Sequence, residues 1–190
     1  MTDHSHPSTF GPSALATPAN AVTFARLLAT PILIAMVAAR GPGWPQVVLG
    51  AAIGLSDLLD GWIARRQGTT SSGAFLDPLV DKVVVVGVFA ALAARGEIAW
   101  LPVALIAGRE LSMSVYRSVM ARRGVSIPAR RSAKIKTLVQ GLALLLCLMP
   151  PTSGHSALIE AGVWVAVAFT VVTGVQYVLD GRRAAREGAG

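Results

Sequence analysis

The sequence predicts an all-α integral membrane protein with six transmembrane helices. Of its 190 residues, 53% are hydrophobic and only 14% are charged, and the mean hydropathy is +0.59. Soluble domains carry about 25% charged residues, so this composition is not that of an ordinary soluble domain. A spanning helix needs about 20 apolar residues. The sequence has apolar stretches near this length, and short polar or Pro- and Gly-rich breaks separate them.

The expected helices begin and end at these breaks. Pro42, between two glycines, ends the first apolar stretch, and Pro150-Pro151 ends the fifth. A polar segment over 67–72 separates the second stretch from the third. We expect helices over about 21–39, 44–66, 73–94, 98–122, 132–149 and 156–179.

The chain is expected to have one membrane domain and two tails. Residues 1–19 are rich in Ser, Thr, Pro, Ala and His, and they lack the basic and apolar regions of a signal peptide. We therefore expect a disordered cytoplasmic tail over 1–19, a six-helix membrane domain over 20–180 and a basic cytoplasmic tail over 181–190. The single cysteine, Cys147, lies in an apolar stretch and is predicted to be a small buried hydrophobic residue.

Basic residues are concentrated on one side of the expected membrane. Eleven of the 17 Lys and Arg residues lie in loops or helix ends that share one side, whereas only Arg40 and Arg95 lie on the other. Because loops rich in Lys and Arg stay in the cytoplasm, this predicts a multi-pass protein of the cell (inner or plasma) membrane, with both termini cytoplasmic. The eleven are Arg65, Arg66, Arg122, Arg123, Arg130, Arg131, Lys134, Lys136, Arg182, Arg183 and Arg186.

Four aspartates lie at the cytoplasmic ends of the second and third expected helices. They are Asp57, Asp60, Asp77 and Asp81. The first two are three residues apart and the last two are four apart, so each pair shares a helix face. If the two helices face each other, the carboxylates converge and need cations; hard divalent ions such as Mg²⁺ prefer oxygen ligands. The alternative is a polar cluster at the helix ends, paired with Arg65 and Lys82.

A second set of ionisable residues is basic and is expected at the same membrane face. Its members are Arg26, Arg109, Arg117, Lys134 and Lys136. Together with a metal site they indicate an anionic substrate such as a phosphate ester. Two alternatives stay open: the lysines could hold anionic lipid headgroups, and the arginines within the fourth helix could pair with Glu110 or a backbone carbonyl.

The acidic stretch resembles the signature of a known family. Asp57-x-x-Asp60-Gly61-x-x-Ala64-Arg65, followed by Gly73-x-x-x-Asp77-x-x-x-Asp81, is similar to the signature of the CDP-alcohol phosphatidyltransferases. Seven residues separate Arg65 from Gly73, where family members often have eight. The resemblance implies six helices around a polar cavity that is open to the cytoplasm, usually in a homodimer.

The resemblance also implies roles for individual residues. The four aspartates would hold two Mg²⁺ or Mn²⁺ ions against CDP-diacylglycerol, and Asp81 would also be the catalytic general base. The CDP-diacylglycerol site would include Gly61, Ala64, Arg65 and Gly73. The acceptor's phosphate would be bound by Arg109, Arg117, Lys134, Lys136, Thr23 and Arg26.

Three further stretches resemble the phosphatidylglycerophosphate synthase branch of the family. They are Asn20 to Pro31, Asp77-Pro78-Leu-Val-Asp81-Lys82, and Gly108-Arg109-Glu110 with Lys134 to Gln140; Ala133 departs from the branch, where glycine is frequent. This implies transfer of a phosphatidyl group from CDP-diacylglycerol to glycerol 3-phosphate, giving phosphatidylglycerol phosphate and CMP.

Two alternatives to this activity remain. Cardiolipin synthases of the same fold, which use phosphatidylglycerol as the acceptor, share the Asp-Pro-x-x-Asp-Lys stretch. A membrane transporter with an acidic cluster is an alternative of another class, although the aspartates are expected at one membrane face and no half-repeat is visible. We expect membrane lipids among the partners and no nucleic acid.

Overall fold

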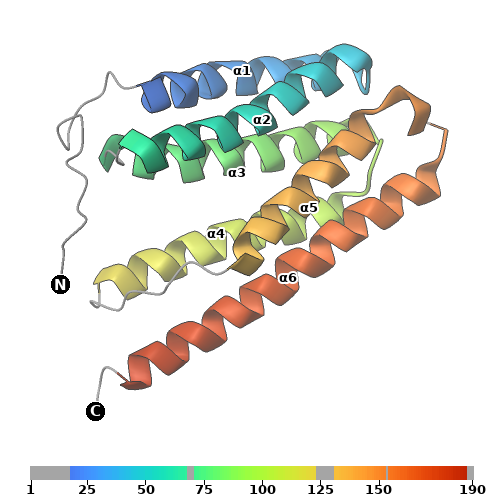
Figure 1. Cartoon of the computed structure of the whole chain (residues 1–190). Helices are drawn as coiled ribbons and strands as arrows, with labels where there is room; N and C mark the ends of the chain where they lie inside the picture. The colour runs from blue at the N-terminus through green and yellow to red at the C-terminus, as the bar shows by residue number, and fades with distance from the viewer. Residues whose placement is uncertain (1–17, 68–70, 123–130, 153, 188–190) are drawn as a thin grey trace.

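Six long α-helices and one short 3₁₀ turn make up the described part of the chain (Figure 1). The computed structural model describes residues 18–67, 71–122, 131–152 and 154–187, and within them it leaves out the side chains of 18–20, 57–79, 121, 131–134 and 183–187. The elements are α1 (Pro18–Arg40), α2 (Trp44–Gln67), α3 (Ser71–Ala94), α4 (Trp100–Arg122), α5 (Arg131–Leu148), η1 (Pro150–Thr152) and α6 (Ser156–Glu187). These helices confirm the predicted all-α class, and no strand occurs in the described ranges.

The sixth helix is longer than predicted. The apolar pattern stops near Leu179, but α6 continues to Glu187. The added segment contains Ala, Arg and Glu, which are good helix formers, and it contains no proline. A loss of hydrophobicity marks where a helix can leave an apolar environment, and the backbone can remain helical beyond that point.

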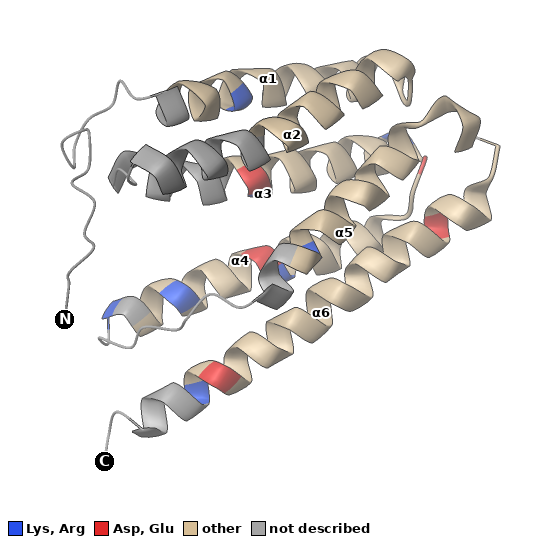
Figure 2. Cartoon of the chain, in the orientation of Figure 1, with Lys and Arg blue, Asp and Glu red and all other residues tan. Residues whose placement is uncertain are grey.

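Successive helices run in alternating directions, because short connections join them (Figure 1). The starts of α1, α3 and α5 therefore lie at the same end of the bundle as the ends of α2, α4 and α6. We call this the charged end, because most of the described Lys, Arg, Asp and Glu residues lie in the half of the bundle nearer to it (Figure 2). The sequence-predicted site residues all fall in this half or at its border.

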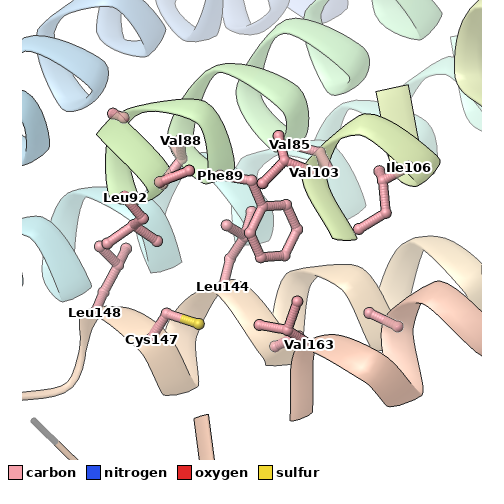
Figure 3. Close-up of a cluster of buried hydrophobic side chains, with 14 of the residues drawn as sticks. Val85, Val88, Phe89, Leu92, Val103, Ile106, Leu144, Cys147, Leu148 and Val163 are labelled. Atoms are coloured by element: carbon pink, nitrogen blue, oxygen red, sulfur yellow. The ribbon is translucent and has the colours of Figure 1, made fainter. Parts of the chain in front are cut away.

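The hydrophobic core occupies the half of the bundle away from the charged end. Helix α1 packs against α2 and α3, α5 packs against α2, α3 and α6, and α4 packs against α3 and α6. The core residues come from the later turns of α1, α3 and α5, the middle of α2, and the earlier turns of α4 and α6. Phe89 and Leu144 are among them (Figure 3). Cys147 is 2% exposed within this cluster, which confirms that it is a buried hydrophobic residue. This packing leaves the other half of the interior for polar groups.

The distribution of polar and apolar side chains is that of a membrane protein. Large apolar side chains such as Leu28, Val48 and Leu111 are exposed on the surface, whereas Glu110 and Gln140 are buried. Lipid favours this arrangement, because apolar groups need no shielding from it and polar groups must find partners inside.

Two helices contain a segment long and apolar enough to cross a bilayer. They are α1, over Ala21–Arg40, and α6, over Ser156–Arg182, in a search that covered only the described residues. In α2 and α5 the same search finds shorter apolar segments, Trp44–Ser56 and Ile135–Leu148, and α4 carries Arg109, Glu110 and Arg117 along its length. The chain is thus a membrane protein, and the number of six spans stays a prediction.

Gly41 ends α1 with a backbone conformation that other residues rarely adopt. Its φ is +76°, and the side chain of Arg95 lies over it and donates to the carbonyl of Ala38 at 3.0 Å. A Cβ at Gly41 would lie 2.9 Å from Arg95 Nε. Gly96 has the same φ of +76°, but an added Cβ there would meet nothing within 4 Å.

We therefore expect Gly41→Ala to destabilise the fold more than Gly96→Ala. Both changes force alanine into the left-handed region, at a cost of about 1–2 kcal/mol. Only Gly41→Ala also displaces the end of the Arg95 side chain and its hydrogen bond, which adds about 0.5 kcal/mol because this hydrogen bond is exposed. Thermal unfolding of the two purified variants in detergent measures the difference, and equal melting temperatures would contradict the Arg95 contact.

Candidate active site

Asp81 of α3 forms an ion pair with Arg26 of α1 near the charged end. Arg26 Nη2 donates to Asp81 Oδ1. The arginine side chain is 3% exposed, whereas the aspartate side chain is 33% exposed. Thr23, one turn before Arg26, is also buried, and the Thr30 hydroxyl donates to the carbonyl of Arg26 at 2.7 Å. A buried guanidinium thus holds one side of a carboxylate that remains accessible from another side.

The other three aspartates lie on the two helices that the sequence predicts for them. Asp57 and Asp60 are in α2 and Asp77 is in α3, but their side chains are outside the described part. Asp57 lies ten residues before the end of α2, and Asp81 lies ten residues after the start of α3. Since a helix rises about 1.5 Å per residue, both are about 15 Å from the short connection between the helices. Asp60 and Asp77 are both about 10 Å from it, so the four positions form two levels of matched depth.

The residues predicted to bind CDP-diacylglycerol lie near the same connection. Gly61, Ala64 and Arg65 are in the last two turns of α2, and Gly73 is in the first turn of α3. Their surroundings fall outside the described side chains. Their predicted role therefore rests on the sequence and on their position in the helices.

Glu110 of α4 joins two basic side chains in the interior of the bundle. Lys136 Nζ of α5 donates to Glu110 Oε1. Arg109 Nη1 donates to the same oxygen at 3.1 Å. Glu110 is 6% exposed and Lys136 is 8% exposed. The acceptor-site residues Arg109 and Lys136, which are far apart in the sequence, are thus brought together by one buried carboxylate.

Arg109 is also held from α6. Its Nη2 donates to Thr173 Oγ1 at 3.3 Å. The neighbouring Gly174 leaves room for it, because a Cβ there would lie 3.3 Å from Arg109 Nε and 3.4 Å from its Cγ. The Nε donor is buried and has no hydrogen-bond acceptor among the described residues. The guanidinium therefore has contacts on two helices that fix its orientation.

A third cation, Lys82 of α3, contacts α4 one turn after Glu110. Its Nζ donates to Ser114 Oγ, and that hydroxyl donates to the carbonyl of Glu110 at 2.7 Å. We call Lys82, Arg109, Glu110 and Lys136 the Glu110 cluster. With three cations and one anion, its formal charge is +2. Asp81 and Lys82 are neighbours in the chain, so α3 connects this cluster to the ion pair of Arg26.

The remaining predicted acceptor residues are not all in the Glu110 cluster. Arg117 is exposed and lies over the ring of Tyr177 of α6, with its guanidinium carbon 5.7 Å from the ring centroid. Tyr116 meets the same ring edge-on, with 6.1 Å between centroids. Arg26 pairs with Asp81, Thr23 is buried one turn before Arg26, and the side chain of Lys134 falls outside the described part. The predicted acceptor residues whose side chains are described thus fall into one group at Glu110, one on α1 at Arg26, and the surface residue Arg117.

Residues that the sequence does not predict for the site also make these contacts, and Glu110, Lys82 and Thr173 are three of them. In the sequence, Glu110 is an alternative partner for an arginine and Lys82 an alternative partner for the aspartates, and both lie in stretches that carry the family resemblance. Its position inside an apolar helix could have identified Glu110 as a site residue. Burying a carboxylate in a membrane costs free energy, so such residues usually have a charged partner or a function. Thr173 gives no such signal, since a threonine in an apolar helix is common.

Comparisons with known proteins identify the family. The model of the CDP-alcohol phosphatidyltransferase family matches residues 16–172. A "Probable phosphatidylglycerophosphate synthase" of Mycobacterium tuberculosis (strain CDC 1551 / Oshkosh) is 34% identical over 177 residues, covering 88% of this chain and 83% of the relative.

Two further relatives are named CDP-diacylglycerol–glycerol-3-phosphate 3-phosphatidyltransferase. The protein of Rickettsia bellii (strain RML369-C) is 32% identical over 83% of this chain and 91% of its own length. That of Pseudomonas fluorescens is 32% identical over 86% of this chain and 93% of its own length. A match of this length, over the helices that carry both groups of polar residues, shows that the chain belongs to the CDP-alcohol phosphatidyltransferase family.

Proposed function

We propose that this chain transfers the phosphatidyl group of CDP-diacylglycerol to glycerol 3-phosphate, giving phosphatidylglycerol phosphate and CMP. The observation that carries the proposal is the pairing, through α3, of an accessible carboxylate with an interior cluster of net positive charge. Relatives named for this reaction cover most of the chain at 32–34% identity. The site also lies where a lipid donor and a water-soluble acceptor can meet, toward one end of a membrane bundle.

The four aspartates fit a site for divalent metal ions. Four carboxylates at two matched depths on connected helices supply the oxygen ligands that hard cations prefer. We propose that Asp57, Asp60, Asp77 and Asp81 would hold two ions, Mg²⁺ or Mn²⁺. When bound, such ions neutralise charge on the pyrophosphate and on the departing phosphate.

The residues around the aspartates would receive the nucleotide of CDP-diacylglycerol. Gly61, Ala64 and Gly73 have small or absent side chains, so the backbone of α2 and α3 can be approached closely there. Arg65 would meet the pyrophosphate, since a guanidinium binds phosphate oxygens with paired hydrogen bonds.

Asp81 would act as the general base in the transfer step. The hydroxyl oxygen of the acceptor attacks the phosphorus that carries the diacylglycerol, and its proton passes to the Asp81 carboxylate. The bond between this phosphorus and the bridging oxygen breaks, and CMP leaves with that oxygen. Arg26 would orient Asp81 for this role, because it holds Oδ1 from a buried position.

The Glu110 cluster would bind the phosphate of the acceptor. A phosphate monoester carries about −1.5 to −2 charges at pH 7, which balances the formal +2 of the cluster. Phosphatidylglycerol has only a singly charged diester, so the charge balance favours glycerol 3-phosphate over the acceptor of a cardiolipin synthase. We propose that Arg109 and Lys136 make the main contacts with this phosphate. Further contacts with the acceptor would come from outside the cluster, from Lys134, Arg117, Thr23 and Arg26.

We also propose an orientation of the chain in the membrane and a homodimeric assembly. The charged end would face the cytoplasm of a cell (inner or plasma) membrane, because the basic loops of the sequence lie at that end. All six long helices would span the bilayer, between cytoplasmic tails over 1–19 and 181–190. The family resemblance supports a homodimer.

The test of the proposed function is release of CMP by the purified protein with different acceptors. CDP-diacylglycerol in detergent micelles is offered with glycerol 3-phosphate, phosphatidylglycerol or inositol phosphate. We expect metal-dependent CMP release and a lipid product only with glycerol 3-phosphate. A preference for phosphatidylglycerol would replace the proposal with cardiolipin synthesis. No CMP release with any acceptor would favour the transporter.

Arg109→Ala is expected to raise the KM for glycerol 3-phosphate by about tenfold or more, because a charged hydrogen-bond donor to phosphate is lost. The KM for CDP-diacylglycerol should change little, since the donor is proposed to bind at the aspartates. Arg95→Ala is the matched control, because Arg95 lies at the opposite end of the bundle. Steady-state kinetics with each substrate varied in turn would measure both constants. An unchanged KM for glycerol 3-phosphate would remove Arg109 from the acceptor site.

A further inference from the structure

Glu110 stands out as a buried acid among cations that are proposed to bind an anion. Its side chain is 8% exposed and lies between Arg109 and Lys136. For phosphate binding alone, an acid at this place is unfavourable, because it repels the substrate. Its presence therefore needs a physical reason beyond charge attraction.

That reason is found in the contacts that Glu110 makes. Both cations donate to one oxygen, Oε1, so the guanidinium and the ammonium are fixed relative to each other. A buried ammonium without a paired anion is costly, since the interior cannot replace the lost water. Glu110 thus lets Lys136 stay charged inside the bundle and gives Arg109 a fixed partner.

The helix α6 completes the support of Arg109. Thr173 Oγ1 accepts from Nη2, and this hydroxyl is itself anchored by donating to the carbonyl of Phe169 at 2.7 Å. Gly174 allows the close approach of the Arg109 side chain. The arginine is therefore held by an acid on its own helix and a hydroxyl on another.

We propose that Glu110 is a positioning residue of the acceptor site: it presents Arg109 and Lys136 at a fixed spacing to the acceptor's phosphate. Thr173 holds Arg109 in the same way from α6. This inference rests on the proposed function, since it assigns these cations to the acceptor. It adds that a negatively charged residue is needed for tight binding of a negatively charged substrate.

The test is the kinetics of Glu110→Gln in the full-length protein. Glutamine keeps the size and one acceptor oxygen but loses the charge. We expect the KM for glycerol 3-phosphate to rise about tenfold or more, while the KM for CDP-diacylglycerol stays within about twofold. Glu110→Asp, which keeps the charge, should recover part of the loss. The matched control is Glu160→Gln, because Glu160 is an exposed acid on α6 away from the charged end.

Coupling between variants separates positioning from a general loss of structure. If Glu110 acts through Lys136, adding Glu110→Gln to Lys136→Met should raise the KM by much less than Glu110→Gln does alone. If Glu110→Gln does not fold, Thr173→Val tests the same inference from α6. It should raise the KM for glycerol 3-phosphate, whereas Thr173→Ser, which keeps the hydroxyl, should not.

The outcomes distinguish this inference from the proposed function. An unchanged or lower KM in Glu110→Gln, with an active wild type, would overturn the positioning role and leave the function in place. A loss in kcat with both KM values unchanged would mean a structural role only. If the wild type prefers another acceptor, the proposed function fails, and the same KM comparison is made with that acceptor. A wild type without transfer would overturn both.

Discussion

Asp81→Asn is expected to lower the rate of CMP release by about 10²–10⁴, because loss of a general base typically costs this much. Loss of a metal ligand adds to the effect, since the same carboxylate is proposed to hold a divalent ion. Asparagine removes the charge and the basicity of the side chain while it keeps the size. Its oxygen can still accept from Arg26 Nη2, so the contact between α1 and α3 is not simply deleted.

The measurement is CMP release at saturating concentrations of both substrates. Asp180→Asn is the matched control, because Asp180 is another aspartate toward the charged end, in α6, that is not proposed to take part in the reaction. Thermal unfolding of both variants should match the wild type within a few degrees. Activity of Asp81→Asn within about tenfold of wild type would exclude the general-base role.

Removal of divalent metal is expected to slow the reaction at least about a hundredfold, since such ions contribute several kcal/mol to stabilising the transition state. An excess of chelator should abolish CMP release, and added Mg²⁺ or Mn²⁺ should restore it. The same chelator loaded beforehand with Mg²⁺ is the control for effects on the detergent or the lipid. Full activity in the free chelator would exclude the metal site.

Direct metal binding gives a second measure of the same site. We expect about two Mn²⁺ ions per chain in the wild type, as a two-metal phosphoryl-transfer site requires. Asp57→Asn and Asp77→Asn should each lower this number, because each removes one of the four carboxylates. A variant that binds the full number of ions would remove that aspartate from the ligand set.

Much of the fold could be predicted because its determinants are local. Apolar stretches and the Pro and Gly breaks between them depend only on neighbouring residues, and they placed the six helices within a few residues of their observed ends, α6 excepted. Helix α6 was underestimated, because hydrophobicity reports the surroundings of a helix and its backbone continued into a polar segment. The spacing of the four aspartates is local too.

The contacts of the site could not be predicted in this way. Arg26 and Asp81 are 55 residues apart in the chain, and Lys136 and Glu110 are 26 apart. A helical pattern shows which residues share a face, but it does not show which helix that face meets. Arg117 illustrates the difference, because it was grouped with Arg109 by charge and its ring contact is with Tyr177 on α6.

Composition and local spacing are enough to predict the all-α membrane class, the order of the helices and the acidic motif that identifies the family. Each of these follows from composition or from spacing along one or two neighbouring helices. The packing of the helices is needed to show that Arg26 holds Asp81 and that one buried acid joins Arg109 to Lys136. It also shows that Thr173 supports Arg109 from α6. Such pairings depend on how helices distant in the chain pack against one another, and the cost of burying charge then selects partners that satisfy it.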